Sequence, residues 1–117
     1  MEYMIMFYET QDDFSHRAPE QAAAHMGAWM AYIGAMKSAG VMTSGNGLQP
    51  PSLATTVRLR GGKRQVQDGP FADTREQLGG YVILQVDSLD AALEWAARAP
   101  CASTGGVEVR PVLPPMP

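Results

Sequence analysis

The sequence predicts an α+β fold in which two helices cover one face of an antiparallel sheet. The predicted elements follow the order strand, helix, strand, hairpin, strand, helix, strand, which is the ferredoxin-like β-α-β-β-α-β pattern with an extra hairpin. Two of the strands are apolar on both faces, yet two helices can cover only one face of a sheet. We therefore expect a homodimer joined through the other sheet face, that is, a dimeric α/β barrel.

The strands are predicted from short apolar runs with aromatic and β-branched residues and, in the hairpin and the last strand, from alternation of side chains between the two faces. Residues 2–9 and residues 80–86 are the two strands that are apolar on both faces. Residues 54–69 indicate a hairpin with Gly61-Gly62 at its turn, and residues 70–79 a connecting loop. The last strand, which begins at about residue 105, places Val107 and Val109 on one face and Glu108 and Arg110 on the other.

The helices are predicted from their end signals and apolar periodicity. The first runs from Pro19 to Ala39 and ends at Gly40, with a buried arc of Ala22, His25, Met26, Trp29, Met30, Tyr32, Ile33 and Met36. The second covers residues 88–99, with Asp87 as its N-cap. Its expected buried stripe is Leu89, Ala92, Leu93 and Ala96.

Length and composition exclude several classes of protein. The 117 residues fit one domain, residues 1–117. The nine Lys and Arg are scattered in a chain of net charge −3, so we expect no nucleic-acid partner. No apolar run reaches the roughly 20 residues of a membrane span. One cysteine, Cys101, and two histidines give no metal motif, and we expect a cytoplasmic protein without a cofactor.

The segment DGPFADTREQLGGY, residues 68–81, resembles the signature of the DGPF family of YCII-related proteins. The resemblance extends over nearly the whole chain and implies the dimeric ferredoxin-like barrel. Most DGPF proteins have no assigned activity, and their relatives occur beside sigma factors, which implies a regulatory setting. The broader YCII group carries a histidine and an aspartate in a cleft. Here the histidine position falls on Trp29, and His25 lies one turn earlier.

Asp68 and His25 are the candidate catalytic residues. Asp68 could act as a general acid or base at the mouth of the barrel, or it could only accept hydrogen bonds in a turn that Phe71 anchors in the core. His25 could relay protons with Asp68 as its partner, or it could be a packing residue. The sequence does not decide between the catalytic and the structural role for either residue.

A small carboxylated ligand could be bound by Tyr3, Trp29, Arg58, Phe71 and Tyr81. Trp29 could equally belong to the core, and Arg58, Arg60 and Arg110 could lie on solvated strand faces. Glu76 could form a salt bridge within its loop, or it could be an acid of the site. Cys101 has no flanking basic cluster in sequence, which disfavours a nucleophile.

Two functions follow from these candidates. The first is a small cofactor-free lyase or isomerase that acts on a carboxylated metabolite, with Asp68 moving the proton. The alternative is a non-catalytic dimeric module that binds a ligand or a regulatory partner in sigma-factor signalling. A polar pocket that contains Asp68 would favour the enzyme. A mostly apolar pocket without a pair of interacting titratable groups would favour the non-catalytic module.

Overall fold

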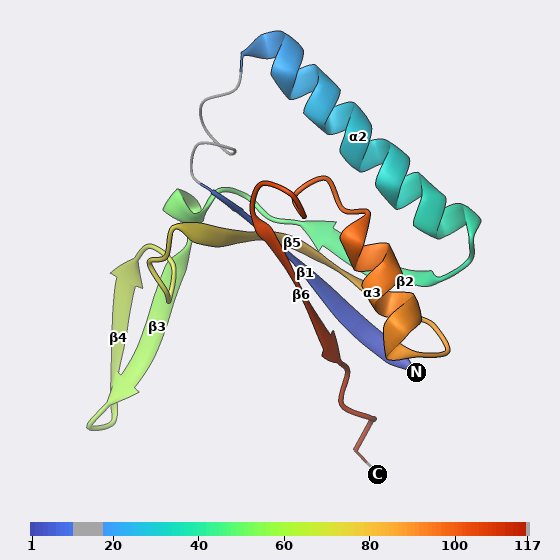
Figure 1. The fold of residues 1–117 in the computed structure, drawn as a ribbon. Coiled ribbons are helices and arrows are strands. Elements are labelled where there is room, and N and C mark those ends of the chain that lie inside the picture. The colour runs from blue at the N-terminus through green and yellow to red at the C-terminus, as the bar shows by residue number, and fades with distance from the viewer. Residues whose placement is uncertain (11–17, 117) are drawn as a thin grey trace.

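The computed structural model describes residues 1–10 and 18–116. Its four-stranded sheet has the order β2-β5-β1-β6, and all neighbouring strands are antiparallel (Figure 1). The elements are β1 (Glu2–Thr10), α2 (Pro19–Ser38), β2 (Met42–Gly47), the 3-10 turn η1 (Pro51–Leu53), β3 (Thr55–Arg60), β4 (Lys63–Asp68), β5 (Glu76–Gln85), α3 (Leu89–Ala97) and β6 (Gly106–Pro111). This is the expected ferredoxin-like α+β arrangement with a hairpin inserted between β2 and β5.

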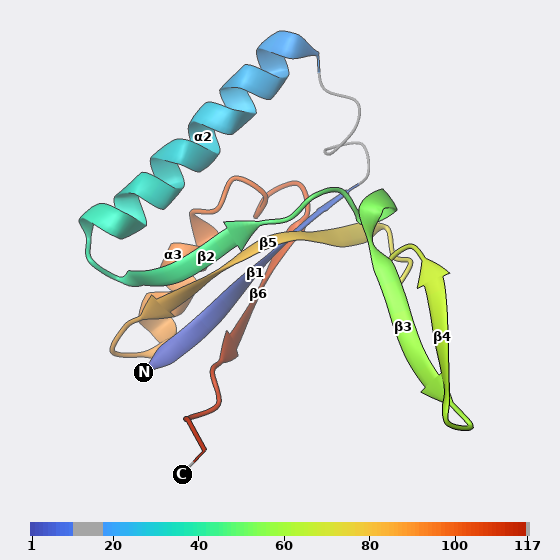
Figure 2. The same cartoon turned by 180° about the vertical axis from the view of Figure 1, so that it is seen from behind.

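The core lies between the sheet and the two helices (Figure 2). Alternate residues of β1 and β5 enter it, among them Ile5 and Leu84, which are fully buried. Tyr32 and Met36 enter it from α2, and Ala92 and Ala96 from α3. Within residues 1–10 and 18–116, no helix lies on the opposite sheet face, as predicted, and its apolar residues Met4, Met6, Tyr81 and Ile83 are only half-buried. The dimer and the barrel remain predictions.

The strand β5 begins at Glu76, within the segment that we expected to be a loop. Two glycines allow β2 to approach this part of β5 closely. A Cβ atom on Gly80 would lie 2.9 Å from the carbonyl oxygen of Asn46, and Leu48 N–H donates to the Gly79 carbonyl at 2.9 Å. Backbone hydrogen bonding between β2 and the glycines of β5 therefore extends β5 into a segment whose side chains do not predict a strand.

Both helices differ in detail from the prediction. Ser88, not Asp87, caps α3, since its hydroxyl accepts from Ala91 N–H at 3.1 Å. The helix α3 is rotated so that Ala91 and Trp95 flank its buried line, which leaves Leu89 and Leu93 exposed.

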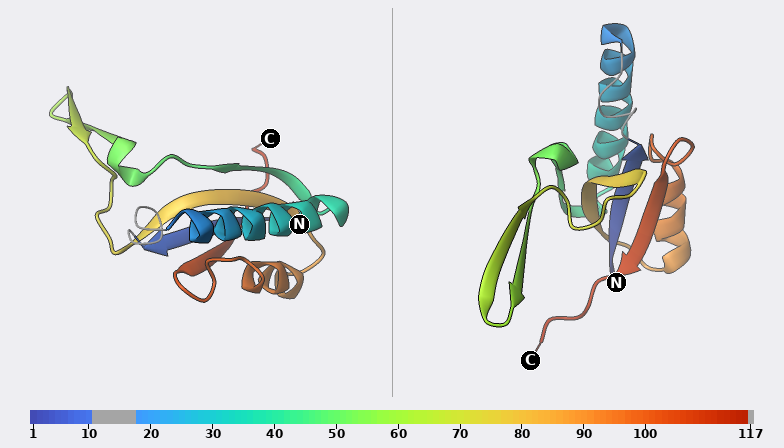
Figure 3. Two further views of the ribbon diagram at one scale, coloured as in Figure 1. Left: turned by 90° about the horizontal axis from the view of Figure 1, so that it is seen from above. Right: turned by 90° about the vertical axis from the view of Figure 1, so that its left-hand side faces the viewer.

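The first turns of α2 extend beyond the end of the sheet (Figure 3). Met26 and Met30 of α2 are exposed, although the sequence placed them in the buried arc. The opposite, alanine-rich face is exposed at Ala24, Ala28 and Ala31, as its small side chains allow.

The hairpin β3–β4 forms a separate two-stranded sheet that stands away from the body (Figure 1). Gly61 and Gly62 have φ values of 58° and 76°, as a tight turn requires. Gly69, with φ 106°, reverses the chain after β4. No helix in the described residues is both long and apolar enough to cross a bilayer.

Candidate functional site

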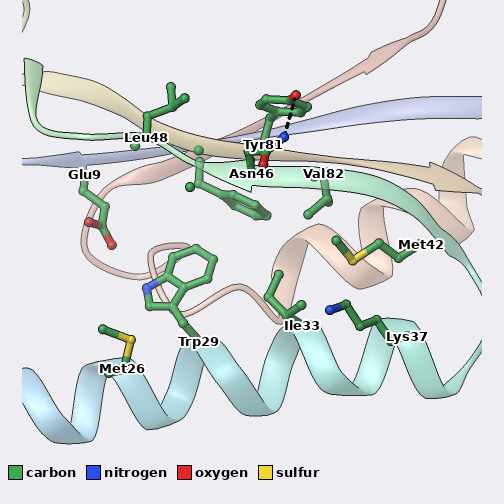
Figure 4. A pocket seen from close by; sticks show the side chains of 15 residues that line it. Glu9, Met26, Trp29, Ile33, Lys37, Met42, Asn46, Leu48, Tyr81 and Val82 are labelled. Carbon is green, nitrogen blue, oxygen red and sulfur yellow. Dashed lines mark hydrogen bonds between the residues drawn. The ribbon is translucent and has the colours of Figure 1, made fainter. Parts of the chain in front are cut away.

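A pocket of about 480 Å³ lies between α2 and the β2–β5 side of the sheet (Figure 4). Its walls are mainly apolar, and two charged side chains, Glu9 and Lys37, reach it from β1 and from the last turn of α2. The lining residues are Phe7, Glu9, Met26, Trp29, Ile33, Lys37, Met42, Gly45, Asn46, Gly47, Leu48, Gly79, Gly80, Tyr81 and Val82. A mostly apolar cavity with a few polar groups is typical of small-molecule sites.

Glu9, His25 and Trp29 form a polar cluster at one end of this pocket. Glu9 is 7% exposed, and its Oε1 atom lies 3.2 Å from His25 Nε2. The indole Nε1–H of Trp29 donates to the same His25 nitrogen at 2.9 Å. Phe7 packs edge-to-face on Trp29 with 4.8 Å between the ring centroids, which fixes the indole that orients the imidazole.

The geometry leaves Glu9 short of a hydrogen-bond donor. If His25 Nε2 accepts from Trp29, its lone pair is used and it has no proton to give to Glu9. Within the described residues, Glu9 Oε1 then receives no hydrogen bond although it is buried. A buried acceptor without a donor is costly, and such groups call for an explanation. A substrate proton entering the pocket would satisfy this oxygen.

The sequence contains a signal for Glu9 that our prediction missed. Tyr3, Ile5 and Phe7 alternate along β1 and are buried, and the next residue in this alternation is Glu9. A carboxylate at a core-facing strand position is rare unless it is paired or functional. His25 and Trp29 are four residues apart in α2 and therefore lie on one helix face.

The structure places His25 beside Glu9, which is a different carboxylate from the expected partner. Asp68 lies at the exposed end of β4, opposite Thr55 in the hairpin, and it is not among the residues that line the pocket. Thr56 Oγ1 donates to the Gly69 carbonyl at 2.8 Å, which ties the Asp68-Gly69 turn to β3.

Of the expected ligand-binding residues, Trp29 lines the pocket with its side chain. The ring of Tyr81 lies on the other side of the strands from Trp29 (Figure 4), where its hydroxyl accepts from Asn46 Nδ2 at 3.2 Å. Tyr3 is buried in the core, and its hydroxyl contacts Met1 Sδ at 3.7 Å. Tyr81 therefore borders the pocket with its backbone, and Tyr3 supports the sheet beneath it.

Phe71 does not anchor its loop in the core, and that expectation is wrong. Its side chain is 76% exposed, and the Arg58 guanidinium lies over the ring at 4.9 Å. The hairpin stands off the body, so no core is within reach of this loop. Arg58 and Phe71 are therefore partners of each other outside the pocket.

Arg110 lies on the helix-free sheet face, where it forms an ion pair with Glu108. Tyr8 lies beside the same carboxylate at 3.4 Å. Burial, and then the neighbouring negative charge of Glu108, raise the pKa of the Tyr8 hydroxyl above its ordinary value.

Cys101 is buried, and its thiol lies 3.6 Å from the Gly106 carbonyl. The described residues contain no group of three His, Cys, Asp or Glu side chains that could hold a metal ion.

Comparison with known proteins identifies the family. An uncharacterised protein of Rhizobium meliloti (strain 1021) is 46% identical over 67 residues, which are 56% of this chain and 54% of that protein. The match thus spans about half the length of that relative. The structure of 5-chloro-2-hydroxyhydroquinone dehydrochlorinase from Burkholderia phenoliruptrix, in complex with 2,5-dihydroxybenzoquinone, is similar with a TM-score of 0.57, 14% identity, and coverage of 97% of this chain and 94% of that one. The model of the YCII-related domain matches residues 1–115, and the chain therefore belongs to the YCII-related family.

Proposed function

We propose that this protein is a lyase- or isomerase-type enzyme that moves a proton on a small carboxylated metabolite. The observation that carries the proposal is Glu9, a buried carboxylate that borders a cavity and whose Oε1 atom lacks a hydrogen-bond donor within the described residues. In this proposal Glu9 is the proton acceptor. His25 Nε2, at 3.2 Å from Glu9 Oε1, takes up the proton or returns it once the Trp29 indole has released this nitrogen.

The chemistry follows from the position of a base beside an apolar cavity. Glu9 would remove a proton from a carbon next to a carbonyl group, and the electron pair left behind would form an enolate. Return of the proton to another atom of the substrate completes an isomerisation. Expulsion of a leaving group from the neighbouring carbon, with the proton kept on the Glu9–His25 pair until release to water, completes an elimination.

Lys37 is the residue that we propose to hold the substrate carboxylate. It reaches the pocket from the end of α2, and its amine points toward Ile33 (Figure 4). No ion pair with a described residue engages it, whereas Arg110 is paired with Glu108. Lys37 follows Trp29 by eight positions, which corresponds to about 12 Å along the helix. A ligand that spans both ends would place its apolar part along Phe7, Trp29 and Ile33.

The similar solved structure supports this class of reaction. Its name describes a dehydrochlorinase, which is an elimination enzyme, and it was solved with a ring-shaped dihydroxybenzoquinone. A ring of that kind is compatible with the aromatic wall of the pocket. The match concerns the fold, so the identity of our substrate rests on the pocket alone.

The homodimer belongs to this proposal. Met4, Met6, Tyr81 and Ile83 form a half-buried apolar strip on the helix-free sheet face, and face-to-face packing with a second copy would remove it from water. In that assembly Asp68 and Arg58 stay predicted site residues, because the hairpin that carries them would lie near the second copy.

Proton exchange into deuterated water tests the proposal without knowledge of the natural substrate. Arylpyruvates and other carboxylated carbonyl compounds would be incubated with the protein, and loss of the carbon-bound proton followed by ¹H NMR. We expect accelerated exchange for at least one compound, and a loss of about 10²–10⁴-fold in Glu9→Gln.

Glu94→Gln is the matched control, because it makes the same chemical change on the exposed surface of α3, outside the pocket, and it should keep the exchange rate. Equal exchange by wild type and Glu9→Gln would contradict the proposal. Tight binding of a compound that never exchanges would instead favour the ligand-binding, regulatory alternative.

A further inference from the structure

The β3–β4 hairpin has an uncovered apolar face. Cross-strand pairing places Val57 opposite Val66, and Leu59 opposite Arg64. Val57, Leu59 and Val66 share one face and are 57%, 68% and 56% exposed. The other face is polar, with Arg58 hydrogen-bonded to Gln67 at 3.4 Å and Arg60 opposite Lys63.

Such a hairpin is poorly supported by its own contacts. An isolated two-stranded ribbon is marginally stable in water, and it becomes stable when a face packs against other structure. The body of this chain does not provide that support, because the hairpin forms its own sheet and projects from the end of β5 (Figures 1 and 3). An exposed apolar strand pair of this kind indicates an interaction surface.

Charge identifies the type of surface that the hairpin fits. Residues 55–68 carry four basic side chains, Arg58, Arg60, Lys63 and Arg64, against one acidic side chain, Asp68. The hairpin therefore has a net charge of +3. The whole chain carries −3, so the remainder carries −6. A second copy of this chain is thus electrostatically complementary to the hairpin.

The direction of the hairpin leads to the same partner. In Figure 1 the hairpin projects to the side of the sheet that faces away from α2 and α3. The hairpin thus reaches toward the side where the sheet carries no helix and where a second copy would cover the apolar strip. A two-fold axis would let each copy receive the hairpin of the other, so that both apolar faces are buried in one closed assembly.

We propose that the β3–β4 hairpin is a dimerisation arm that packs Val57, Leu59 and Val66 on the acidic body of a second copy. This proposal does not depend on catalysis by Glu9. The arm would be a second dimer contact, made by residues other than those of the sheet face. Such a contact would account for the position of the hairpin away from the body of the chain.

Sedimentation of matched variants tests the arm. Leu59→Asp introduces a negative charge on the apolar face, and Gln65→Asp introduces the same charge on the polar face of the same hairpin. Each dimer contains two arms, and loss of a well-packed apolar contact costs at least about tenfold per arm. We expect Leu59→Asp to raise the dimer Kd by about 100-fold or more, and Gln65→Asp to change it by less than a tenth of that factor.

Both positions are exposed, so both variants should keep the near-UV circular dichroism of the folded monomer. Equal dimer Kd values for the two variants, or a wild-type protein that remains monomeric at every concentration, would overturn the proposal. Because neither residue lines the pocket, proton exchange by these variants reports separately on the proposed catalysis.

Carbodiimide coupling provides a second readout of the same contact. The chain has two lysines, Lys37 and Lys63, and Lys63 stands at the tip of the arm. In a mixture of ¹⁴N- and ¹⁵N-labelled protein, we expect Lys63 to couple to carboxylates of the differently labelled copy, outside residues 55–68. Coupling of Lys63 only within its own copy would contradict the arm.

Discussion

Glu9→Gln should make the protein more stable and less active at the same time. The side chain is 7% exposed, and its Oε1 atom faces the occupied Nε2 atom of His25 at 3.2 Å without a donor from the described residues. Functional groups held in this way lower stability, because folding removes them from water without replacing their hydrogen bonds.

The size of the effect follows from this geometry. A buried polar group without a partner costs about 1–3 kcal/mol, and more when it is charged. Glutamine has nearly the same shape as glutamate and keeps one acceptor oxygen. The substitution therefore removes the cost of burying a charge, but a buried oxygen without a donor remains. We expect the free energy of unfolding to rise by about 1 kcal/mol, which corresponds to an increase of about 4 °C in Tm for a chain of this size.

Urea unfolding followed by circular dichroism measures this change at neutral pH. Glu94→Gln is the control, because it makes the same substitution on the exposed surface of α3, and it should change the free energy by less than about 0.5 kcal/mol. A Glu9→Gln variant that is less stable than wild type by 1 kcal/mol or more would refute the reasoning. It would show that Glu9 forms a stabilising ion pair with a protonated His25.

Three further predictions concern the fold around the pocket. Burial raises the pKa of Tyr32 above its ordinary value of 10.0, so its contribution to stability is present below about pH 10 and is lost as the pH rises further. Tyr32→Phe loses the 2.9 Å hydrogen bond to the Trp95 carbonyl; urea unfolding should show about 1 kcal/mol lower stability at pH 7 and a smaller decline above pH 10. Gly105→Ala should cost about 3 kcal/mol in the same assay, since its Cβ would lie 2.1 Å from the Tyr8 carbonyl oxygen, and an unchanged stability would contradict this packing. Gly27→Ala meets nothing within 4 Å, and thermal unfolding should show stabilisation by up to about 1 kcal/mol.

The fold was predictable because its signals are local. The apolar runs of β1 and β5, the helix-ending Gly40 and the Gly61-Gly62 turn each have a direct physical basis, and the structure confirms them. The start of β5 was missed because glycines carry no side-chain pattern. The exposure of Leu89 and Leu93 was not predicted, because the rotation of a helix about its axis is set by its contacts with the sheet.

The site was predictable only in part. His25 and Trp29 were predicted as site residues from their residue types and their common helix face; the structure joins them by a hydrogen bond, and their roles stay predictions. Glu9 was missed because the DGPF motif favours Asp68 as the carboxylate of the site. Which carboxylate approaches His25 depends on how α2 crosses the sheet, and this is a tertiary relation that sequence spacing does not define.

A crystal structure with bound 3-(4-hydroxyphenyl)propionate would test the proposed role of Glu9, because this compound combines an aromatic ring, a hydroxyl donor and a carboxylate. We predict that it occupies the pocket beside Trp29, with the hydroxyl donating to Glu9 and the carboxylate directed toward Lys37. An empty pocket together with ligand bound at Asp68 would contradict this role of Glu9. The role would also be contradicted by a Glu9 side chain whose two oxygens both accept hydrogen bonds from the protein itself.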